Sequence, residues 1–293
     1  MKNIKHFITV FLLVFLYACN NTGSNTETSP AEKVVIERKE VNIDYTDSKK
    51  GDTVLCFIHG WGINQPYWIN QVNAFEKKYR VVTLDLPGFG KSGKNRKDWT
   101  VEEYGKDLSA VFKKLNLKNV ILVGHSMSDA IIVETAITNP DRVIGIVGVD
   151  NFKSYGAVIT AQQEQAIAGF FNEAKHNYTK TVSGYVNDAL FSPSTDSLVR
   201  KRVLTDILKT DSVVSIYVLE QNFKYPLDAR ILSLKKCLYL INSSFTPTDT
   251  AAYIKNKIDY YLLNIGPTGH YPMLEKPVEF NSLLQQAIEK INK

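Results

Sequence analysis

The feature that most constrains the fold is an apolar run that stops at a glycine–serine turn and continues as a helix. Residues 120–123 read Val-Ile-Leu-Val, a pattern typical of a strand that is buried on both faces. The turn Gly-His-Ser-Met-Ser follows at residues 124–128, and residues 130–136 continue with an apolar helical pattern. A buried strand that leads directly into a helix is typical of a parallel sheet covered by helices, so this segment predicts an α/β fold.

Ser126 stands at the apex of this turn, an arrangement called a nucleophile elbow. A free serine hydroxyl is a poor nucleophile, so it must be held out of the backbone, beside a base and near the first N–H groups of a helix. The turn alone is equally consistent with an ordinary serine–glycine loop. The flanking strand and helix patterns favour a catalytic serine.

The same alternation of strands and helices extends through most of the 293-residue chain, which is long enough for one large α/β domain or two small ones. We expect strands at residues 33–36, 41–45, 54–58, 81–84, 143–149, 237–241 and 260–263. We expect helices at residues 67–78, 101–115, 249–257 and 277–291. The predicted architecture is a mostly parallel central sheet flanked by helices, built from residues 33–150 and 233–293.

The alternation breaks between residues 151 and 232. No convincing strand pattern occurs there, whereas helical patterns do, for example at residues 162–174 and 198–208. Neither flank alone would complete a sheet. We therefore interpret residues 151–232 as a helical cap inserted into one α/β domain rather than as a separate domain.

The N-terminus carries a basic start followed by an apolar run that is too short to span a bilayer, which is typical of a secretory signal. The run ends in Leu-Tyr-Ala-Cys at residues 16–19, which resembles the signal of a bacterial lipoprotein. That resemblance implies a signal peptide at residues 1–18 and a lipid on Cys19. Residues 19–32 then form a flexible tether to a membrane of the cell envelope. A plain cleaved signal, giving a secreted or periplasmic protein, is the alternative.

Composition excludes several other classes of function. The net charge of +5 is modest and no basic helix face stands out, so we expect no nucleic-acid partner. Three cysteines, Cys19, Cys56 and Cys237, cannot make a disulfide framework, although Cys56 and Cys237 could pair in an oxidising compartment. No Cys/His cluster has metal-ligand spacing, so we expect no metal and no cofactor. The sequence does not indicate an oligomeric state.

Taken together, these segments resemble the α/β-hydrolase superfamily over nearly everything after residue 33. The resemblance rests on four short motifs in the family's order: His-Gly-Trp-Gly at residues 59–62, the loop at residues 85–92, the elbow at residues 124–128, and Gly269-His270. It implies a serine nucleophile, a late histidine base and an acid between them in the sequence.

By this resemblance Ser126 attacks the substrate, while His270 takes the serine proton and returns it to the leaving group. The oxyanion hole would use the backbone N–H groups of Trp61 and Met127. The loop that begins with Asp85 is expected to shape the turn beside the site.

The acid has two candidates. Many family members carry it in the loop after the strand at residues 237–241, where Asp249 stands at the start of a predicted helix and is also well explained as a helix cap. Other members carry it one strand earlier, where Asp150 ends the strand at residues 143–149. Catalytic groups gather at the carboxyl edge of a parallel sheet, so we favour Asp150 and keep Asp249 open.

The elbow also departs from the family pattern, because Ser128 and Asp129 replace two small glycines. We expect some backbone strain at Ser128. We also expect the Asp129 carboxylate to oppose negative charge that develops in a nearby oxyanion hole. Both features predict reduced activity or a reshaped pocket.

The sequence thus predicts a membrane-tethered serine hydrolase that cleaves carboxylic esters of a small-molecule substrate through an acyl-enzyme. Ser126 argues against the dehalogenases and epoxide hydrolases of the superfamily, which carry an aspartate at this place. A carbon–carbon bond or amide hydrolase shares the same residues and is the alternative within the enzyme class. A non-catalytic binding lipoprotein that keeps the fold is the alternative outside it.

Overall fold

The computed structural model describes residues 32–36 and 41–293. The predicted signal peptide, the lipidation site Cys19 and the tether up to residue 31 lie outside the described residues. Within the described ranges, no helix combines the length and the apolar character needed to cross a membrane.

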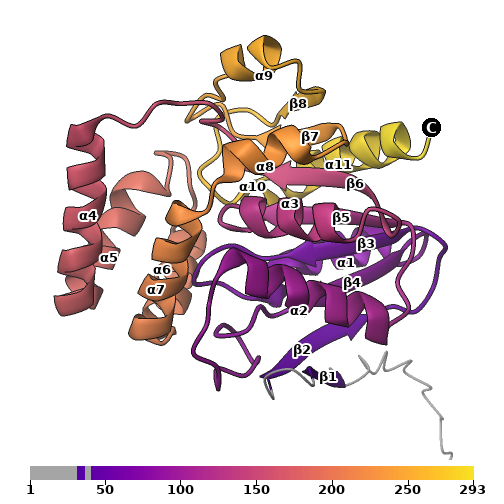
Figure 1. The fold of residues 1–293 in the computed structure, drawn as a ribbon, viewed down its shortest axis with the longest axis horizontal. Helices are drawn as coiled ribbons and strands as arrows, with labels where there is room; N and C mark the ends of the chain where they lie inside the picture. Colours follow the sequence, from indigo (N-terminus) through magenta and orange to yellow (C-terminus); the bar gives the residue numbers. More distant parts are fainter. Residues whose placement is uncertain (1–31, 37–40) are drawn as a thin grey trace, which may run out of the picture. The chain divides into compact units, whose positions relative to one another are not determined.

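Eight strands form one sheet in the order β1-β2-β4-β3-β5-β6-β7-β8 (Figure 1). Their bounds are β1 Glu32–Ile36, β2 Val41–Asp47, β3 Val54–Ile58, β4 Arg80–Leu84, β5 Val120–His125, β6 Val143–Val149, β7 Leu238–Asn242 and β8 Tyr260–Asn264. β2 pairs antiparallel with both β1 and β4, and every other pair is parallel. The prediction of a mostly parallel sheet is confirmed.

The register of the parallel strands brings their carboxyl ends to one edge of the sheet. Ile58 of β3 pairs with Gly124 of β5, and Gly124 pairs with Gly148 of β6. β3, β5 and β7 are buried along their whole length, which explains why each appears in the sequence as a nearly uninterrupted apolar run. The loops that follow these strands therefore emerge beside one another, and they carry the predicted site residues.

Helices cover both faces of the sheet. α2 packs against α3, and α3 packs against α8, in front of the strands in Figure 1; α1 packs against α11 behind them. The bounds are α1 Ile69–Phe75, α2 Val101–Lys114, α3 Ser128–Thr138, α9 Ala251–Lys255, α10 Pro272–Glu275 and α11 Pro277–Ile291. The helix predicted at residues 67–78 is shorter than expected: a 3-10 turn, η1 Gln65–Trp68 with Pro66 in its first turn, precedes α1.

Five helices lie between β6 and β7 in the sequence, and Figure 1 shows α4, α5, α6 and α7 together beside one end of the sheet. The five are α4 Ala161–His176, α5 Tyr178–Ala189, α6 Ser197–Lys209, α7 Ser212–Lys224 and α8 Leu227–Ser233. They occupy the segment that we interpret from the sequence as a helical cap. It belongs to the same compact unit as the sheet, and its last helix, α8, returns to pack on α3.

Candidate active site

Ser126 occupies a sharp turn between β5 and α3. Its φ is +52°, a left-handed conformation that costs an L-residue energy and that the surroundings must enforce. Two backbone bonds do so: the Ser126 N–H donates to the Val149 carbonyl at 3.0 Å, and the Asp129 N–H donates to the Ser126 carbonyl at 3.0 Å. The turn therefore holds the serine side chain away from both flanking elements.

Two glycines let neighbouring segments approach this turn closely. A Cβ at Gly60 would lie 2.5 Å from the His125 ring and 3.1 Å from the Ser126 Cβ. A Cβ at Gly124 would lie 2.8 Å from the Ile132 side chain of α3. Glycine is therefore required where the loop after β3 contacts the elbow and where α3 crosses β5.

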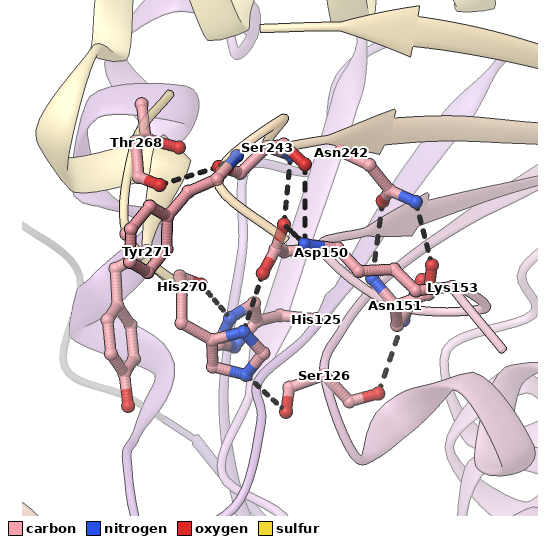
Figure 2. Close-up of polar contacts among 12 residues, drawn as sticks. His125, Ser126, Asp150, Asn151, Lys153, Asn242, Ser243, Thr268, His270 and Tyr271 are labelled. Atoms are coloured by element: carbon pink, nitrogen blue, oxygen red, sulfur yellow. Dashed lines mark hydrogen bonds and ion pairs between the residues drawn. The ribbon is translucent and has the colours of Figure 1, made fainter. Parts of the chain in front are cut away.

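Three side chains from separate loops form one hydrogen-bonded chain (Figure 2). The Ser126 Oγ lies 2.7 Å from the His270 Nε2, and the His270 Nδ1 lies 2.6 Å from an Asp150 carboxylate oxygen, Oδ2. A carboxylate can only accept, so the Nδ1 carries the proton and donates to Asp150. The Nε2 is then free to accept from the serine hydroxyl, which is the arrangement that general-base activation of Ser126 requires.

Asp150 is buried, and both of its carboxylate oxygens are engaged. Oδ1 accepts from the Ser243 N–H at 2.9 Å and pairs with the Lys153 Nζ at 2.7 Å, while Oδ2 faces His270. Burial alone would raise the pKa of Asp150, but the contacts with His270 and Lys153 outweigh burial and lower it to about 2. The group is a carboxylate at any neutral pH.

The structure does not bring Asp249 to this site. Asp249 is exposed, and its carboxylate accepts the Ala251 N–H at 2.9 Å at the start of α9. Asp249 lies one residue before the N-cap Thr250, so its side chain engages the first N–H of the helix without being the N-cap residue itself. Of the two candidates for the acid, only Asp150 contacts His270.

The loop around His270 is fixed from three sides. The His270 N–H donates to the Leu190 carbonyl of the cap at 2.9 Å, and the Ser243 Oγ donates to the Thr268 carbonyl at 2.5 Å. The Glu275 carboxylate accepts the N–H groups of Gly269 at 2.9 Å and Tyr271 at 3.2 Å, on either side of the histidine. These bonds set the backbone position from which the imidazole reaches Ser126.

The predicted oxyanion donors lie on the two segments that contact each other at the elbow. Neither the Trp61 N–H nor the Met127 N–H has a hydrogen-bond acceptor in the described part of the chain. The cap holds both residues in place: the Trp61 Nε1 donates to the Ser215 carbonyl at 2.9 Å, and the Asn222 Nδ2 donates to the Met127 carbonyl at 2.9 Å. Both amides therefore remain available to a substrate oxygen.

Two buried histidines next to the site serve as neutral hydrogen-bonding groups. The His59 Nε2 accepts the Leu86 N–H at 2.9 Å, so its Nδ1 donates to the Gly60 carbonyl at 2.7 Å. The His125 Nε2 lies 2.7 Å from the His270 carbonyl and donates to it. Burial lowers the pKa of both rings, that of His125 to about 3, so neither supplies a charge near pH 7.

The Asp85 loop has the structural role expected of it. The Asp85 side chain is buried, and its two carboxylate oxygens accept the N–H groups of Gln65 at 2.7 Å and Lys91 at 2.8 Å. These bonds close the loop after β4 onto η1. Asp85 thus fixes the loop after β4, and its side chain bonds within that loop and to η1 rather than to Ser126.

The prediction of backbone strain at Ser128 is wrong. The positive φ belongs to Ser126, whereas Ser128 is the first residue of α3. The Ser128 side chain is fully buried, and its Oγ donates to the His59 carbonyl at 2.5 Å.

The Asp129 carboxylate is half-buried and accepts the Ala130 N–H at 2.6 Å, and burial raises the pKa of Asp129 to about 7. Its negative charge is therefore only partly developed at neutral pH.

A pair of asparagines that is not predicted from the sequence holds the elbow in place through hydrogen bonds. The Asn151 Nδ2 donates to the Gly124 carbonyl at 2.9 Å and to the Ser126 carbonyl at 3.2 Å, and Figure 2 shows the bond to Ser126. Asn242, at the end of β7, exchanges two hydrogen bonds with the Asn151 backbone, at 2.9 and 3.2 Å. The signal is present in the sequence, because Asn242 ends β7 and Asn151 follows the end of β6 by two residues.

Among the residues that the structure describes, no group of three or more His, Cys, Asp or Glu side chains could hold a metal ion. Cys56 and Cys237 are both free thiols. Burial raises the pKa of the Cys56 thiol to about 12 and that of Cys237 to about 11, so neither is a reactive thiolate.

Known proteins share both the motifs and the fold. Residues 53–200, half of the chain, match the sequence model of the alpha/beta hydrolase fold family. A 2-hydroxy-6-oxononadienedioate/2-hydroxy-6-oxononatrienedioate hydrolase from Burkholderia vietnamiensis is 26% identical over 287 residues, which cover 91% of this chain and 98% of that protein. A pimeloyl-[acyl-carrier protein] methyl ester esterase from Yersinia enterocolitica is 22% identical over 83% of this chain and 96% of that protein.

A match over a shorter segment has a higher sequence identity. An (E)-2-((N-methylformamido)methylene)succinate hydrolase from Acinetobacter baylyi is 34% identical over 99 residues, which span 34% of this chain and 37% of that protein. Among solved structures, a thermophilic esterase from Thermogutta terrifontis superimposes with a TM-score of 0.76 at 16% identity, over 90% of this chain and all of that one. The sheet, the elbow and the matched motifs agree, and the chain belongs to the alpha/beta hydrolase fold family.

Proposed function

We propose that this protein is a serine hydrolase that cleaves carboxylic esters through an acyl-enzyme on Ser126. The observation that carries the proposal is the continuous hydrogen-bonded chain from the Ser126 Oγ through His270 to Asp150, with distances of 2.7 and 2.6 Å. A serine that is merely structural does not require a base at hydrogen-bonding distance or a carboxylate behind that base.

In the proposed reaction the Ser126 Oγ attacks the ester carbonyl carbon while the His270 Nε2 accepts the hydroxyl proton. The carbonyl oxygen becomes an oxyanion that accepts from the N–H groups of Trp61 and Met127. When the intermediate collapses, the bond to the alcohol breaks, and the alcohol oxygen takes the proton from His270. A water molecule then attacks the acyl-enzyme with the same base, which releases the carboxylic acid and restores Ser126.

Asp150 would keep the imidazole in the required tautomer and stabilise the imidazolium that forms during each step. Its role is supported by the contact of Oδ2 with the His270 Nδ1 and by its persistent negative charge. The related proteins named as esterases, from Yersinia and from Thermogutta, favour an ester as the bond that is cleaved.

Carbon–carbon bond hydrolysis is the second candidate. It is favoured by the match over nearly the whole length of the Burkholderia protein, which is named as a hydrolase of a 2-hydroxy-6-oxo dienedioate. Both reactions use the same three side chains. They differ in the substrate that the cap admits.

A fluorophosphonate probe tests the shared chemistry directly. The folded protein should be labelled stoichiometrically, the labelled peptide should contain Ser126, and Ser126→Ala should abolish labelling. Absence of labelling on folded wild-type protein would favour a non-catalytic binding protein. A panel of esters, thioesters, amides and 1,3-diketones then decides between ester and carbon–carbon cleavage, because turnover of diketones without turnover of esters would overturn the first proposal.

We further propose that the protein is lipid-anchored at Cys19 in a bacterial cell envelope. The support is the sequence of residues 1–19 alone. Metabolic labelling with an alkyne fatty acid should mark the wild type and not Cys19→Ser. A labelled Cys19→Ser variant, or an unlabelled wild type found in the soluble secreted fraction, would contradict the anchor.

A further inference from the structure

A lysine is paired with the carboxylate that faces His270. The Lys153 Nζ lies 2.7 Å from the Asp150 Oδ1 and 3.4 Å from the Ser243 carbonyl oxygen (Figure 2). Only 14% of the Lys153 side chain and 4% of the Asp150 side chain is exposed. Removing an ammonium group from water is costly unless it is compensated, so a largely buried lysine side chain at this position needs an explanation.

The two carboxylate oxygens of Asp150 have different partners. Oδ1 receives the Ser243 N–H and the Lys153 ammonium, and Oδ2 receives the His270 Nδ1–H. With Oδ1 held by two donors, the carboxylate cannot rotate without breaking both contacts. Oδ2 is thereby aimed at the imidazole.

The ammonium also changes the electrostatics of the pair. The imidazolium that would form during catalysis is stabilised by the negative charge of Asp150, and a positive charge on the far side of the same carboxylate opposes that stabilisation. We propose that Lys153 is a positioning residue for the Asp150–His270 pair, which fixes the carboxylate and offsets part of the negative charge that faces the imidazole. This inference rests on the proposed function, because it assigns Lys153 a role in activating the same serine.

The remaining ionisable groups around the pair do not compensate for a loss of Lys153. From β5, His125 lies next to His270 but is neutral, because burial lowers its pKa to about 3. From the His270 loop, Tyr271 is neutral, because burial raises its pKa well above the usual value. Glu275 is engaged with the N–H groups beside His270, and the exposed Asp249 carboxylate is engaged with α9.

The magnitude follows from the separation of the two charges. Hydrogen-bond lengths on the two oxygens of one carboxylate place the ammonium and the imidazole roughly 6 Å apart. At an effective dielectric constant of about 20, removing the ammonium should raise the midpoint of the His270 titration by about one to two pH units.

The test uses the full-length protein labelled with ¹⁵N-histidine, with the ring resonances of His270 followed by NMR as a function of pH. Lys153→Gln removes the charge but keeps a donor for Asp150, and its His270 midpoint should move upward by about one to two pH units. Lys153→Arg keeps the charge and should leave the midpoint near that of the wild type. Lys255→Met removes an equal charge from the exposed surface of α9 and should leave the His270 midpoint unchanged. The resonances of exposed His176 on α4 serve as the internal reference and should respond to pH in the same way in every variant.

The pH dependence of ester turnover should change in the same way. The acid limb of the profile should move to higher pH in Lys153→Gln and stay near that of the wild type in Lys153→Arg. A His270 midpoint in Lys153→Gln within about 0.3 pH unit of the wild type would overturn the proposal. A His270 midpoint in Lys153→Arg that moves as far as in Lys153→Gln would also overturn it, because the shift would then come from the changed shape of the side chain and not from the loss of its charge. Lys153→Met provides a second neutral variant; if neither neutral variant folds while Lys153→Arg does, Lys153 serves the fold and the proposal fails.

The NMR measurement does not depend on turnover. A wild-type protein that neither reacts with the fluorophosphonate nor cleaves esters would refute the proposed function, while the position of the His270 midpoint would still decide the role of Lys153.

Discussion

Replacing Asp150 by asparagine is the most informative single change, because the structure dictates how the new amide must lie. The Oδ1 position is held by two donors, the Ser243 N–H at 2.9 Å and the Lys153 ammonium at 2.7 Å. Only the carbonyl oxygen of an asparagine can accept both of them. The NH₂ group must therefore occupy the Oδ2 position and face the His270 Nδ1.

An NH₂ group at that position reverses the tautomer of His270. The Nδ1 becomes an acceptor and the Nε2 carries the proton, so the Nε2 can no longer take the proton of Ser126, which lies 2.7 Å away. The stabilising negative charge is lost as well. Loss of both effects should lower kcat by about 10³ to 10⁴-fold, equivalent to about 4–5.5 kcal/mol of activation free energy.

The assay is turnover of an activated aryl ester at pH 8, with thermal unfolding measured in parallel to establish that the variant is folded. Asp249→Asn is the matched control, because the only hydrogen bond of the Asp249 side chain in the described part of the chain is the one it accepts from the Ala251 N–H, which asparagine can accept too, and its backbone bond to the Lys153 carbonyl is unaffected. We expect the control to keep its turnover within about twofold of the wild type. Folded Asp150→Asn that retains more than about a tenth of the wild-type kcat would refute the reasoning.

Three further outcomes can be measured. Asn151→Ala leaves two elbow carbonyls without their side-chain donor, so the free energy of unfolding should fall by about 1–3 kcal/mol and turnover should fall with it; unchanged turnover would argue against a positioning role. Ser128→Gly, which restores the family pattern, should lower the Tm, because the buried His59 carbonyl loses its donor; a higher Tm would contradict this. For Asp129 the folded pKa of about 7 lies above the ordinary 3.8, so ionisation disfavours the folded state as pH rises from about 4 to 7. Asp129→Asn should therefore raise the Tm at pH 8 and leave it nearly unchanged at pH 4, and equal shifts at both pH values would show that the charge is not the cause.

The parts of the fold that could be predicted are those whose signal is local. β3 and β6 begin and end at the predicted residues, because a strand buried on both faces appears as an apolar run with sharp limits. α5 and α7 were not identified individually, since they are rich in β-branched residues and have little helical propensity of their own. Packing against neighbouring cap helices determines their structure.

The sequence favours Asp150 as the acid but does not exclude Asp249, and the reason is physical. Asp150 and Asp249 both follow buried strands that end at the same edge of the sheet, so spacing alone does not separate them. What separates them is the conformation of the backbone: Asp150 has a φ of +48°, and its N–H donates to the Ile241 carbonyl of β7 at 3.0 Å. The contacts of Lys153 could not be predicted from the sequence either, because its partners come from the loops after β6 and β7 and meet only when these strands lie side by side.

The departure of the elbow from the family pattern acquires a different meaning in the structure. Ser128 follows Met127 directly, and His59 precedes Trp61 by two residues, so the bond from the Ser128 Oγ to the His59 carbonyl joins the two segments that carry the predicted oxyanion donors. A glycine at position 128 could not make this bond. The close approach of these segments is already required by Gly60, whose absent side chain leaves room for the elbow. Ser128 therefore adds a side-chain hydrogen bond where these two segments meet, and the spacing of the two donors depends on a bond that a single substitution can remove.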